Sequence, residues 1–411
     1  MMSKQNVPEL RFPEFSGEWE EKKLGEISQN AMYGMNTAAT DFDGENVYVR
    51  ITDIEEQSRK LNTKDFTSPS EINDRYLLNE EDILFARTGA STGKSYLHRS
   101  LNQNLKYYFA GFLIKFELKG GFNPNFIYPQ TLTQKYDKWV KVMSMRSGQP
   151  GINGKEYSLL PIHTTSEEEQ EKIGEFFNKL DRLIELEEKK LELLEEQKKG
   201  YMQKIFSQEL RFKDENGNDY PEWEEKKIGE IASFSKGKDI SKSDLTNEGE
   251  PCVLYGELYT RYKDVINEVH SKTNLPAQFL KVAYKNSVLI PSSGETPIDI
   301  AKATAINVRS VLVGGDINIL NPINGYLGTF ISMIINGRYK KRLSKFSQGK
   351  TVVHLYNNDI KKLKIDLPTY EEQKKISSFL EKFNKLIEIR NSKIEQMKNR
   401  KKTLLQKMYL S

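Results

Sequence analysis

Apolar side chains recur every three or four positions near the end of each half of the chain. The first series is Ile173, Phe177, Leu180, Ile184, Leu191, Leu194, Tyr201 and Ile205. The second series is Ile376, Leu380, Phe383, Ile387, Ile394, Met397, Leu404 and Met408. This spacing predicts two long helices with coiled-coil seams, over residues 169–206 and 372–410. A helix of 38 residues, with a rise of about 1.5 Å per residue, is roughly 57 Å long, so we interpret the helices as spacers.

Charged residues interrupt both seams in the same register. They are Glu187 and Lys198 in the first helix, and Arg390 and Lys401 in the second. A seam glutamate that faces a seam arginine would fix the alignment of the paired helices. Residues 167–206 carry 8 basic and 12 acidic side chains, net −4, whereas residues 371–411 carry 11 and 5, net +6. Opposite charge favours pairing of the two helices with each other, although ordinary solvated surfaces explain the excess equally well.

The segments before each helix show the alternation and composition of β-strands. Residues 46–51, 107–116 and 282–290 are rich in β-branched and aromatic side chains, and glycine, asparagine and proline clusters separate such runs. We therefore predict two mixed α/β domains, each built around a β-sheet, with the long helices between and after them. Strand order does not follow from one sequence.

The two halves of the chain are copies at their ends. Residues 9–12 and 209–212 both read Glu-Leu-Arg-Phe, and nine of the ten residues 18–27 are identical to those at 222–231. A period near 200 residues is a duplicated domain plus helix, far longer than a solenoid repeat. The middles, roughly 30–150 and 235–350, match only in scattered places. One scaffold thus carries two different recognition surfaces, related by a pseudo-twofold internal duplication.

Composition narrows the class of protein. A chain of 411 residues holds two or three domains. The excess of 62 basic over 58 acidic residues permits a polyanionic partner without proving one. The single cysteine, Cys252, and four scattered histidines leave no disulfide and no metal-ligand spacing. With no apolar leader and no run of 18 apolar residues, we expect a soluble, cytoplasmic protein.

Residues 88–95, Thr-Gly-Ala-Ser-Thr-Gly-Lys-Ser, resemble a phosphate-binding P-loop. That loop needs four residues between its glycines, and here Gly89 and Gly93 are separated by three. The corresponding segment of the second half, 291–296, lacks Gly-Lys-Ser and carries Glu295, which would repel phosphate. Nucleotide hydrolysis is therefore a weak alternative.

A better interpretation is that a strand in each domain, 82–86 or 286–290, delivers a polar loop at a matched place. Such side chains offer donors and acceptors to base edges and phosphates, although a solvated turn explains them about as well. The candidate DNA-contacting residues of the first loop are Arg87, Thr88, Ser91 and Lys94. Those of the second loop are Ser292, Ser293, Glu295 and Thr296.

A second polar stretch precedes each long helix. We predict further DNA contacts there from Arg146, Gln149 and Asn153 in the first half, and from Gln348 and Lys350 in the second. The basic run 338–342 suits phosphate contacts or the surface of an amphipathic helix. Trp19 and Trp223 head the repeated segments, and we expect them to pack at the base of each domain. No motif of a reaction centre occurs, and His98, His163, His270 and His354 support neither catalytic nor metal-binding roles.

Taken together, the duplicated motifs resemble the specificity (S) subunit of type I restriction-modification systems. Each half opens with Trp-Glu-x-x-x-Leu/Ile-Gly-Glu-Ile and closes with Leu-Pro, Glu-Gln and a long helix. The likeness covers essentially the whole chain and divides it into six segments. These are an N-terminal segment (1–19), a first DNA target recognition domain (20–160), a first spacer helix (161–207), a linker (208–223), a second recognition domain (224–365) and a second spacer helix (366–411).

The resemblance implies that each domain reads one half of an interrupted duplex DNA target. It also implies an antiparallel coiled coil that sets the spacing and docks two methyltransferase (modification) subunits, together with restriction subunits. S-adenosylmethionine, ATP and magnesium would be bound by those partners, and this chain would catalyse nothing. A coiled-coil scaffold with two protein-binding domains remains the main alternative. Neither the target sequence nor its spacer length follows from the sequence.

Overall fold

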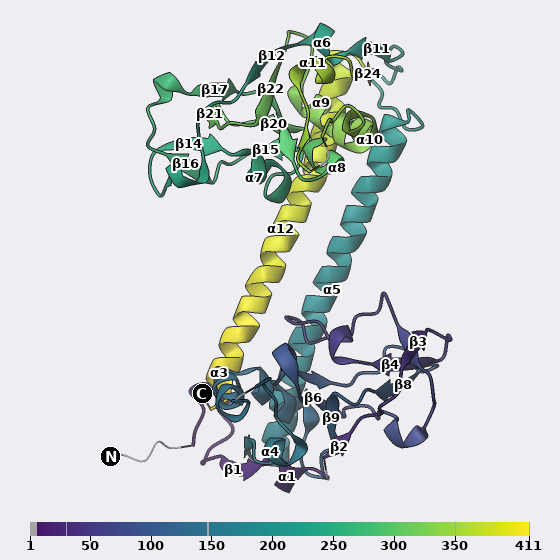
Figure 1. The fold of residues 1–411 in the computed structure, drawn as a ribbon, viewed down its shortest axis with the longest axis vertical. Coiled ribbons are helices and arrows are strands. Elements are labelled where there is room, and N and C mark those ends of the chain that lie inside the picture. Colours follow the sequence, from purple (N-terminus) through teal and green to yellow (C-terminus); the bar gives the residue numbers. More distant parts are fainter. Residues whose placement is uncertain (1–5, 30, 146–147, 350, 411) are drawn as a thin grey trace. The chain divides into compact units, whose positions relative to one another are not determined.

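The computed structural model describes residues 6–29, 31–145, 148–349 and 351–410. The chain forms two compact units: Met1–Glu188 with Ser392–Ser411 (unit 1), and Lys189–Asn391 (unit 2). Each unit combines β-sheets with parts of two long helices, α5 (Glu167–Phe206) and α12 (Tyr370–Met408), which Figure 1 shows in teal and yellow. The predicted mixed α/β fold with two long helices is confirmed. Within the described ranges, no helix has the length and apolar character needed to cross a membrane.

Unit 1 is built around a four-stranded sheet with the order β2-β9-β6-β7. Three further strand pairs, β1-β10, β3-β5 and β4-β8, complete its β-structure. The strands are β1 (Glu20–Lys23), β2 (Met32–Tyr33), β3 (Ala39–Asp41), β4 (Asn46–Val49), β5 (Thr67–Pro69), β6 (Ile83–Ala86), β7 (Ser95–Leu97), β8 (Lys106–Phe109), β9 (Leu113–Phe116) and β10 (Pro161–Thr164). The short helices are α1 (Leu24–Ile27), α2 (Pro124–Ile127), α3 (Gln134–Met143) and α4 (Gly154–Tyr157).

Unit 2 repeats this plan with longer sheets, in the orders β12-β22-β18-β20-β15 and β13-β16-β14-β21-β17, and two pairs, β11-β24 and β19-β23. The strands are β11 (Glu224–Lys227), β12 (Ala232–Lys236), β13 (Leu245–Thr246), β14 (Glu250–Val253), β15 (Val265–Ile266), β16 (Ser271–Thr273), β17 (Lys281–Tyr284), β18 (Val288–Pro291), β19 (Ser293–Gly294), β20 (Thr304–Ile306), β21 (Ser310–Val313), β22 (Ile317–Pro322), β23 (Val353–His354) and β24 (Lys364–Leu367). The helices are α6 (Ile228–Ile231), α7 (Tyr255–Thr260), α8 (Pro297–Ile300), α9 (Gly328–Ile334), the π-helix η7 (Ile335–Tyr339), α10 (Lys340–Ser344) and α11 (Asn357–Ile360).

Two of the segments with β-strand character each contain two strands in the structure. Residues 107–116 contain the end of β8 and all of β9, because the chain reverses at Ala110 and Gly111. Residues 282–290 contain most of β17 and β18, since Asn286 turns the chain with φ +77°. A positive φ favours a turn residue such as asparagine over the β-branched residues around it.

The core of each unit includes the ends of both long helices. In unit 1 the start of α5 and the end of α12 share one cluster, in which the rings of Phe177 and Tyr409 lie 5.8 Å apart. In unit 2 the end of α5 and the start of α12 also share one cluster, and the rings of Tyr201 and Phe379 lie 5.2 Å apart. The helices therefore run antiparallel within each unit. Each of the predicted seam residues is buried or half-buried in the structure, apart from Tyr201, which is exposed.

The charged seam positions find acidic or basic partners. The Glu187 carboxylate lies 3.2 Å from the ammonium of Lys393. Lys198 pairs with Asp264 at 2.8 Å and Lys401 with Asp181 at 2.5 Å. Seam lysines therefore reach the flanks, where their charge is neutralised.

The repeated motifs at the domain ends bind each other. In unit 1 the Arg11 guanidinium donates two hydrogen bonds of 2.7 Å to the fully buried carboxylate of Glu169, in the first turn of α5. In unit 2, Arg211 contacts Glu372 of α12 in the same way, at 3.3 and 2.7 Å. Acidic side chains also suit a helix N-terminus, where the backbone dipole is positive. The duplicated Glu-Leu-Arg-Phe motif therefore fixes each long helix to its own domain.

The glutamine that follows the glutamate in both halves also joins the long helix to its domain. The Gln170 side chain accepts a hydrogen bond from the backbone N–H of Asn123 and donates to the carbonyl of Thr165. Gln373 does the same with Leu327 and Pro368. The predicted packing role of the tryptophans is confirmed: Trp19 lies 5.2 Å from Phe126, and Trp223 lies 5.7 Å from Phe330.

Candidate nucleic-acid interface

The structure brings the two predicted polar segments of unit 1 together. Thr88 and Gly151 form an antiparallel bridge. The backbone N–H of Gly89 donates to the carbonyl of Pro150 at 3.0 Å, and that of Ile152 donates to Arg87 at 2.9 Å. Two segments about 60 residues apart in the sequence thus form one continuous surface.

Unit 2 joins its two predicted segments by the same pattern. Ser293 pairs with His354, and the backbone N–H of Leu355 donates to the carbonyl of Ser292 at 3.0 Å. The bridge is longer here, because Gly294 also pairs with Val353. Each unit therefore presents a loop pair, comprising residues 87–94 with 148–153 in unit 1 and residues 292–296 with 348, 349 and 351–354 in unit 2.

Buried tyrosines hold the unit 1 loop pair from below. The Tyr157 hydroxyl donates to the carbonyl of Ala86 at 2.6 Å and accepts from the N–H of Gly93 at 3.1 Å. The Tyr136 hydroxyl donates to the Gly93 carbonyl at 2.7 Å. Burial raises the pKa of both phenols, so they stay neutral donors. A Cβ at Gly93 would lie 2.4 Å from a methyl of Val140, which explains the second glycine of the false P-loop.

The predicted unit 1 residues have different environments. The Arg87 guanidinium lies 5.1 Å from the centre of the Tyr33 ring and is half-buried. Thr88 and Ser91 are half-buried, and Gln149 is exposed. Asn153 accepts a hydrogen bond from the N–H of Glu156 and so begins α4. The predicted residue Arg146 lies outside the described residues.

Lys94 faces inward in this structure. Its ammonium donates to the carbonyl of Ile54 at 3.0 Å and pairs with Glu56 at 2.7 Å. The hydrogen bond from Lys94 lowers the pKa of the Glu56 carboxyl. A phosphate contact would require Lys94 to leave both partners, so the geometry favours a bracing role for this residue.

The predicted unit 2 residues divide in the same way. Ser292 and Ser293 are buried, while Glu295 is exposed. Thr296 accepts from the N–H of Asp299 at 3.2 Å and begins α8. Gln348 is exposed, with its amide 3.3 Å from Asp359. The predicted residue Lys350 lies outside the described residues.

The basic run 338–342 lies in the π-helix and α10. Arg338 donates to the carbonyl of Phe206, the last residue of α5, and pairs with Asp366 at 3.2 Å. Its charge therefore stabilises the end of the helix, where the backbone dipole is negative. Lys341 and Arg342 are exposed and remain candidates for phosphate contact.

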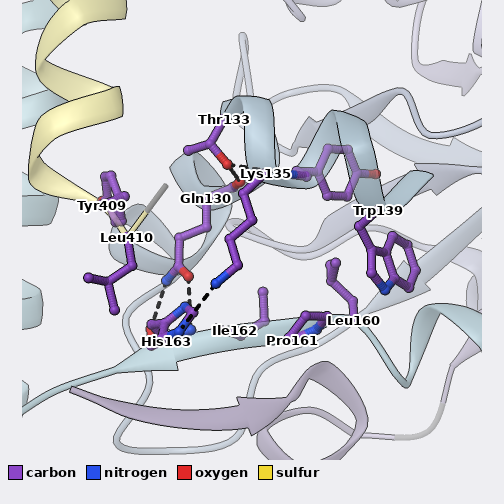
Figure 2. A pocket seen from close by; sticks show the side chains of 11 residues that line it. Gln130, Thr133, Lys135, Trp139, Leu160, Pro161, Ile162, His163, Tyr409 and Leu410 are labelled. Carbon is purple, nitrogen blue, oxygen red and sulfur yellow. Dashed lines mark hydrogen bonds between the residues drawn. The ribbon is translucent and has the colours of Figure 1, made fainter. Parts of the chain in front are cut away.

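Figure 2 shows a small cavity in unit 1 where Gln130, Lys135 and His163 converge below the end of α12. The side-chain amide of Gln130 donates to the backbone carbonyl of His163 at 2.8 Å and accepts from its backbone N–H at 2.9 Å. Burial and then Lys135 lower the pKa of His163 to about 4, so the ring is neutral at pH 7. The enclosed volume of about 20 Å³ holds a water molecule and excludes a nucleotide.

A larger hollow of about 390 Å³ in unit 2 lies between α5, α12 and the π-helix, next to Lys198 and Asn336. Both side chains bind Asp264, with distances of 2.8 Å each. Among the residues that the structure describes, no group of histidine, cysteine, aspartate and glutamate has the arrangement of a metal site.

Comparison with known proteins places this geometry in a family. The family described as "Type I restriction modification DNA specificity domain" matches residues 16–196 and 220–399. The type I restriction enzyme MjaVIII specificity subunit of Methanocaldococcus jannaschii is 24% identical over 355 residues, covering 81% of this chain and 79% of its own. The putative MjaX specificity subunit of the same organism is 24% identical over 415 residues, covering 98% and 95%.

Solved structures show the same fold. The crystal structure of the type I restriction-modification S subunit from M. genitalium has a TM-score of 0.64 at 15% identity, with 98% of this chain and 99% of that chain covered. A chain from a structure of complex assembly and conformational transition of a type I system has a TM-score of 0.54 at 16% identity, with 95% and 97% covered. The family match spans both halves, so this chain belongs to the type I restriction-modification DNA specificity family, as a specificity subunit.

Proposed function

We propose that the chain recognises a two-part duplex DNA target, with one half read by each unit. This proposal rests on one observation, the presence of a loop pair in each unit. Both are assembled by equivalent backbone hydrogen bonds, and yet they present different side chains. Two domains that recognise different DNA sequences require the same backbone framework with different side chains on its surface, and the two loop pairs have this property.

The chemistry of the loops suits nucleic acid. Sequence is read by hydrogen bonds and apolar contacts to base edges, while phosphate contacts fix register. In unit 1, Arg87 offers donors beside an exposed aromatic ring, Tyr33, and Gln149 offers an exposed amide. In unit 2, Glu295 and Gln348 offer acceptors and an amide. Lys341 and Arg342 add positive charge for phosphates in unit 2.

We further propose that the long helices dock two modification subunits. Leu183 and Leu186 are exposed on α5, and Leu386 and Ile389 are exposed on α12, which is the same pair of positions shifted by 203 residues (386 − 183 and 389 − 186). Exposed apolar side chains at i and i+3 form a stripe on one helix face, and such patches mark interaction sites. Two equivalent stripes fit two copies of one partner.

Catalysis is assigned to partners in this proposal. Restriction subunits would join the same assembly, and methyl transfer and ATP-driven cleavage would use S-adenosylmethionine, ATP and magnesium bound by those subunits. This chain would position them on chromosomal DNA in the cytoplasm. The two long helices would act as a ruler that sets the number of unread base pairs between the half-sites.

The test is single-molecule sequencing of methylated bases in the host genome, with this gene intact and with it deleted. We expect an interrupted two-part adenine-methylation motif that disappears on deletion, and the target is read in the same experiment. A pull-down on the intact chain serves as the control for a silent partner. A methylation pattern that is unchanged by deletion while an active methyltransferase co-purifies would contradict the proposal.

A further inference from the structure

Three strand ends occupy equivalent positions in the two units. In unit 1 the end of β6 meets the turn between β8 and β9, where the N–H of Arg87 donates to the carbonyl of Phe112 at 3.0 Å. In unit 2 the end of β18 meets the turn between β21 and β22, where the N–H of Ser292 donates to the carbonyl of Asp316 at 2.7 Å. The neighbouring registers agree as well, because Ala86 pairs with Leu113 as Pro291 pairs with Ile317.

The third strand end, that of β2 in unit 1 and of β12 in unit 2, also has an equivalent position in the two units. Tyr33 ends β2 opposite Ile114, and Lys236 ends β12 opposite Asn318. A glycine comes next in both units, and its N–H donates across the sheet, from Gly34 to Leu113 at 3.1 Å and from Gly237 to Ile317 at 2.8 Å. Tyr33, Arg87 and Phe112 therefore correspond to Lys236, Ser292 and Asp316. We name these sets triplet 1 and triplet 2.

Triplet 1 is an arginine supported by aromatic rings. The Arg87 guanidinium lies 5.1 Å from the centre of the Tyr33 ring, which restricts its orientation and leaves its donors available. Phe112, in the turn between β8 and β9, is 62% exposed, and Tyr33 is 41% exposed. A phenylalanine exposed in a turn adds nothing to the core of its own unit, so its presence there needs another reason.

Triplet 2 is charged and has no aromatic ring. The Lys236 ammonium lies 4.0 Å from the Asp316 carboxylate, and the two side chains are 54% and 51% exposed. An ion pair so exposed contributes little to stability. Ser292 is buried behind them and acts as part of the frame. The fold thus needs neither triplet, since the same backbone carries both.

We propose that the exposed and aromatic-supported side chains of the triplets, Tyr33, Arg87 and Phe112 in unit 1 and Lys236 and Asp316 in unit 2, are the specificity-determining residues of the two half-sites, an inference that rests on the proposed function. In unit 1, Arg87 reads a guanine through its O6 and N7 acceptors, and Phe112 contacts an adjacent thymine methyl. In unit 2, Asp316 accepts a hydrogen bond from cytosine N4, and Lys236 donates to a guanine. Each triplet acts on its own half of the target.

The experiment uses the full chain in the host, with methylated-base sequencing of Arg87→Ala, Phe112→Ala, Lys236→Ala and Asp316→Asn. We expect the two unit 1 substitutions to relax one half of the motif only, and the two unit 2 substitutions to relax the other half only. In the purified complex, discrimination at the affected base pair should fall by about 5- to 150-fold, the range for loss of one good base contact. Lys106→Ala and Lys272→Ala, at exposed positions on β8 and β16, are matched controls that should leave the motif intact.

The outcomes separate the two proposals. If the unaltered chain directs no two-part motif, the proposed function is wrong. If it does direct one and all four variants keep both halves unchanged, the triplet assignment alone is wrong.

If a variant loses all methylation, its effect on base discrimination is measured with the purified complex. An unchanged ratio of affinities for the target and its single-base variants overturns the assignment. A ratio that falls at one half-site supports it. The combined exchange Tyr33→Lys, Arg87→Ser and Phe112→Asp should, in addition, give the first half-site the base preference of the second at the positions these residues read.

Discussion

At the scale of single residues, the repeated motifs anchor each long helix to its own domain and have no part in recognition. Arg11 and Arg211 each place a planar guanidinium against a buried glutamate, with paired hydrogen bonds to both oxygens in unit 1. The fork geometry of arginine matches a carboxylate, and lysine does not reproduce it. Removal of the arginine leaves Glu169 or Glu372 as an unpaired charge in the interior, which is costly.

We expect Arg11→Ala to lower the free energy of unfolding of unit 1 by about 3–5 kcal/mol, the usual cost of breaking a buried pair from one side. Arg211→Ala should do the same to unit 2. Hydrogen exchange monitored by mass spectrometry assigns the loss to one unit, which a single melting curve of a two-unit chain cannot do. Lys106→Ala, which removes an exposed pair with Glu45, is the control and should cost less than about 1 kcal/mol. If Arg11→Ala lowered the free energy of unfolding of unit 1 no more than the control Lys106→Ala does, the anchoring role would be contradicted.

Glycines at the strand ends set the shape of the reading surface. A Cβ on Gly34 would lie 2.2 Å from the carbonyl oxygen of Ala110, and one on Gly237 would lie 1.9 Å from that of Gly314. At such distances the added Cβ would force each strand end away from the turn that it faces, after β8 in unit 1 and after β21 in unit 2. We expect Gly34→Ala to abolish recognition of the first half-site and Gly237→Ala that of the second, measured as affinity of the complex for single-base variants of the target. Gly120→Ala, where nothing lies within 4 Å, should have no effect.

Two buried histidines, His98 and His163, make unit 1 sensitive to acid. Burial lowers the pKa of His98 from 6.5 to about 4; Glu80 opposes this shift, and Arg99 adds to it. A lowered pKa means that the unfolded chain binds the proton first, so the stabilisation is present above pH 6.5 and is lost as pH falls toward 4. The loss is of the order of 3 kcal/mol. His98→Gln should make this dependence shallower between pH 7 and 4.5 in hydrogen exchange of unit 1 and leave the share that is due to His163; an unaltered slope would exclude His98 as a source.

At the scale of elements, the long helices were the most predictable part of the chain. Their apolar period is local, so residues 169–206 and 372–410 were identified almost to the ends of α5 and α12. Strand order was not accessible, because β2 pairs with β9 about 80 residues away and nothing in either strand names its partner. The candidate loops were placed correctly by their strands, but Lys94 turned inward, since a sequence does not show which side of a turn is covered.

The triplets show the same limit. Arg87 was identified from the loop that carries it, whereas Tyr33 and Phe112 belong to other strands. Their proximity follows from cross-strand pairing, to which the sequence gives no direct signal. The signal that could have found them is the glycine after Tyr33 and Lys236, which sits at matching places in both halves.

The exposed stripes on the helices make a prediction about assembly. We expect Leu183→Glu with Leu186→Glu to remove one modification subunit from the complex, and Leu386→Glu with Ile389→Glu to remove the other. Charge on an apolar docking surface is strongly unfavourable once water is excluded. Native mass spectrometry of the co-expressed subunits counts the copies retained. Val142→Glu, at an exposed apolar position on α3, is the control, and full stoichiometry in both double variants would show that docking takes place elsewhere.

At the scale of the whole molecule, the proposal depends on the length of the two helices. Ion pairs in unit 1 match Asp181 with Lys401 and Glu187 with Lys393, so residues 182–185 of α5 and 396–399 of α12, which lie between these pairs within unit 1, face each other in an antiparallel register. Deletion of both four-residue segments keeps facing positions matched. It shortens each helix by about 6 Å, which is nearly two base pairs of duplex at 3.4 Å per step.

We expect the double deletion to shorten the unread spacer of the methylation motif and to leave both half-sites unchanged, because the reading loops are untouched. Deletion from α5 alone should instead abolish methylation, since one helix then slips against the other by more than a turn and the seam pairs are lost. Methylated-base sequencing gives spacer length and half-sites in one measurement. If the double deletion changed the bases read and kept the spacer, the helices would act on recognition directly and the ruler would be wrong. A shorter spacer with intact half-sites would show that length and base preference are held by separate parts of the chain, as the divergence of the middles and the repetition of the ends require.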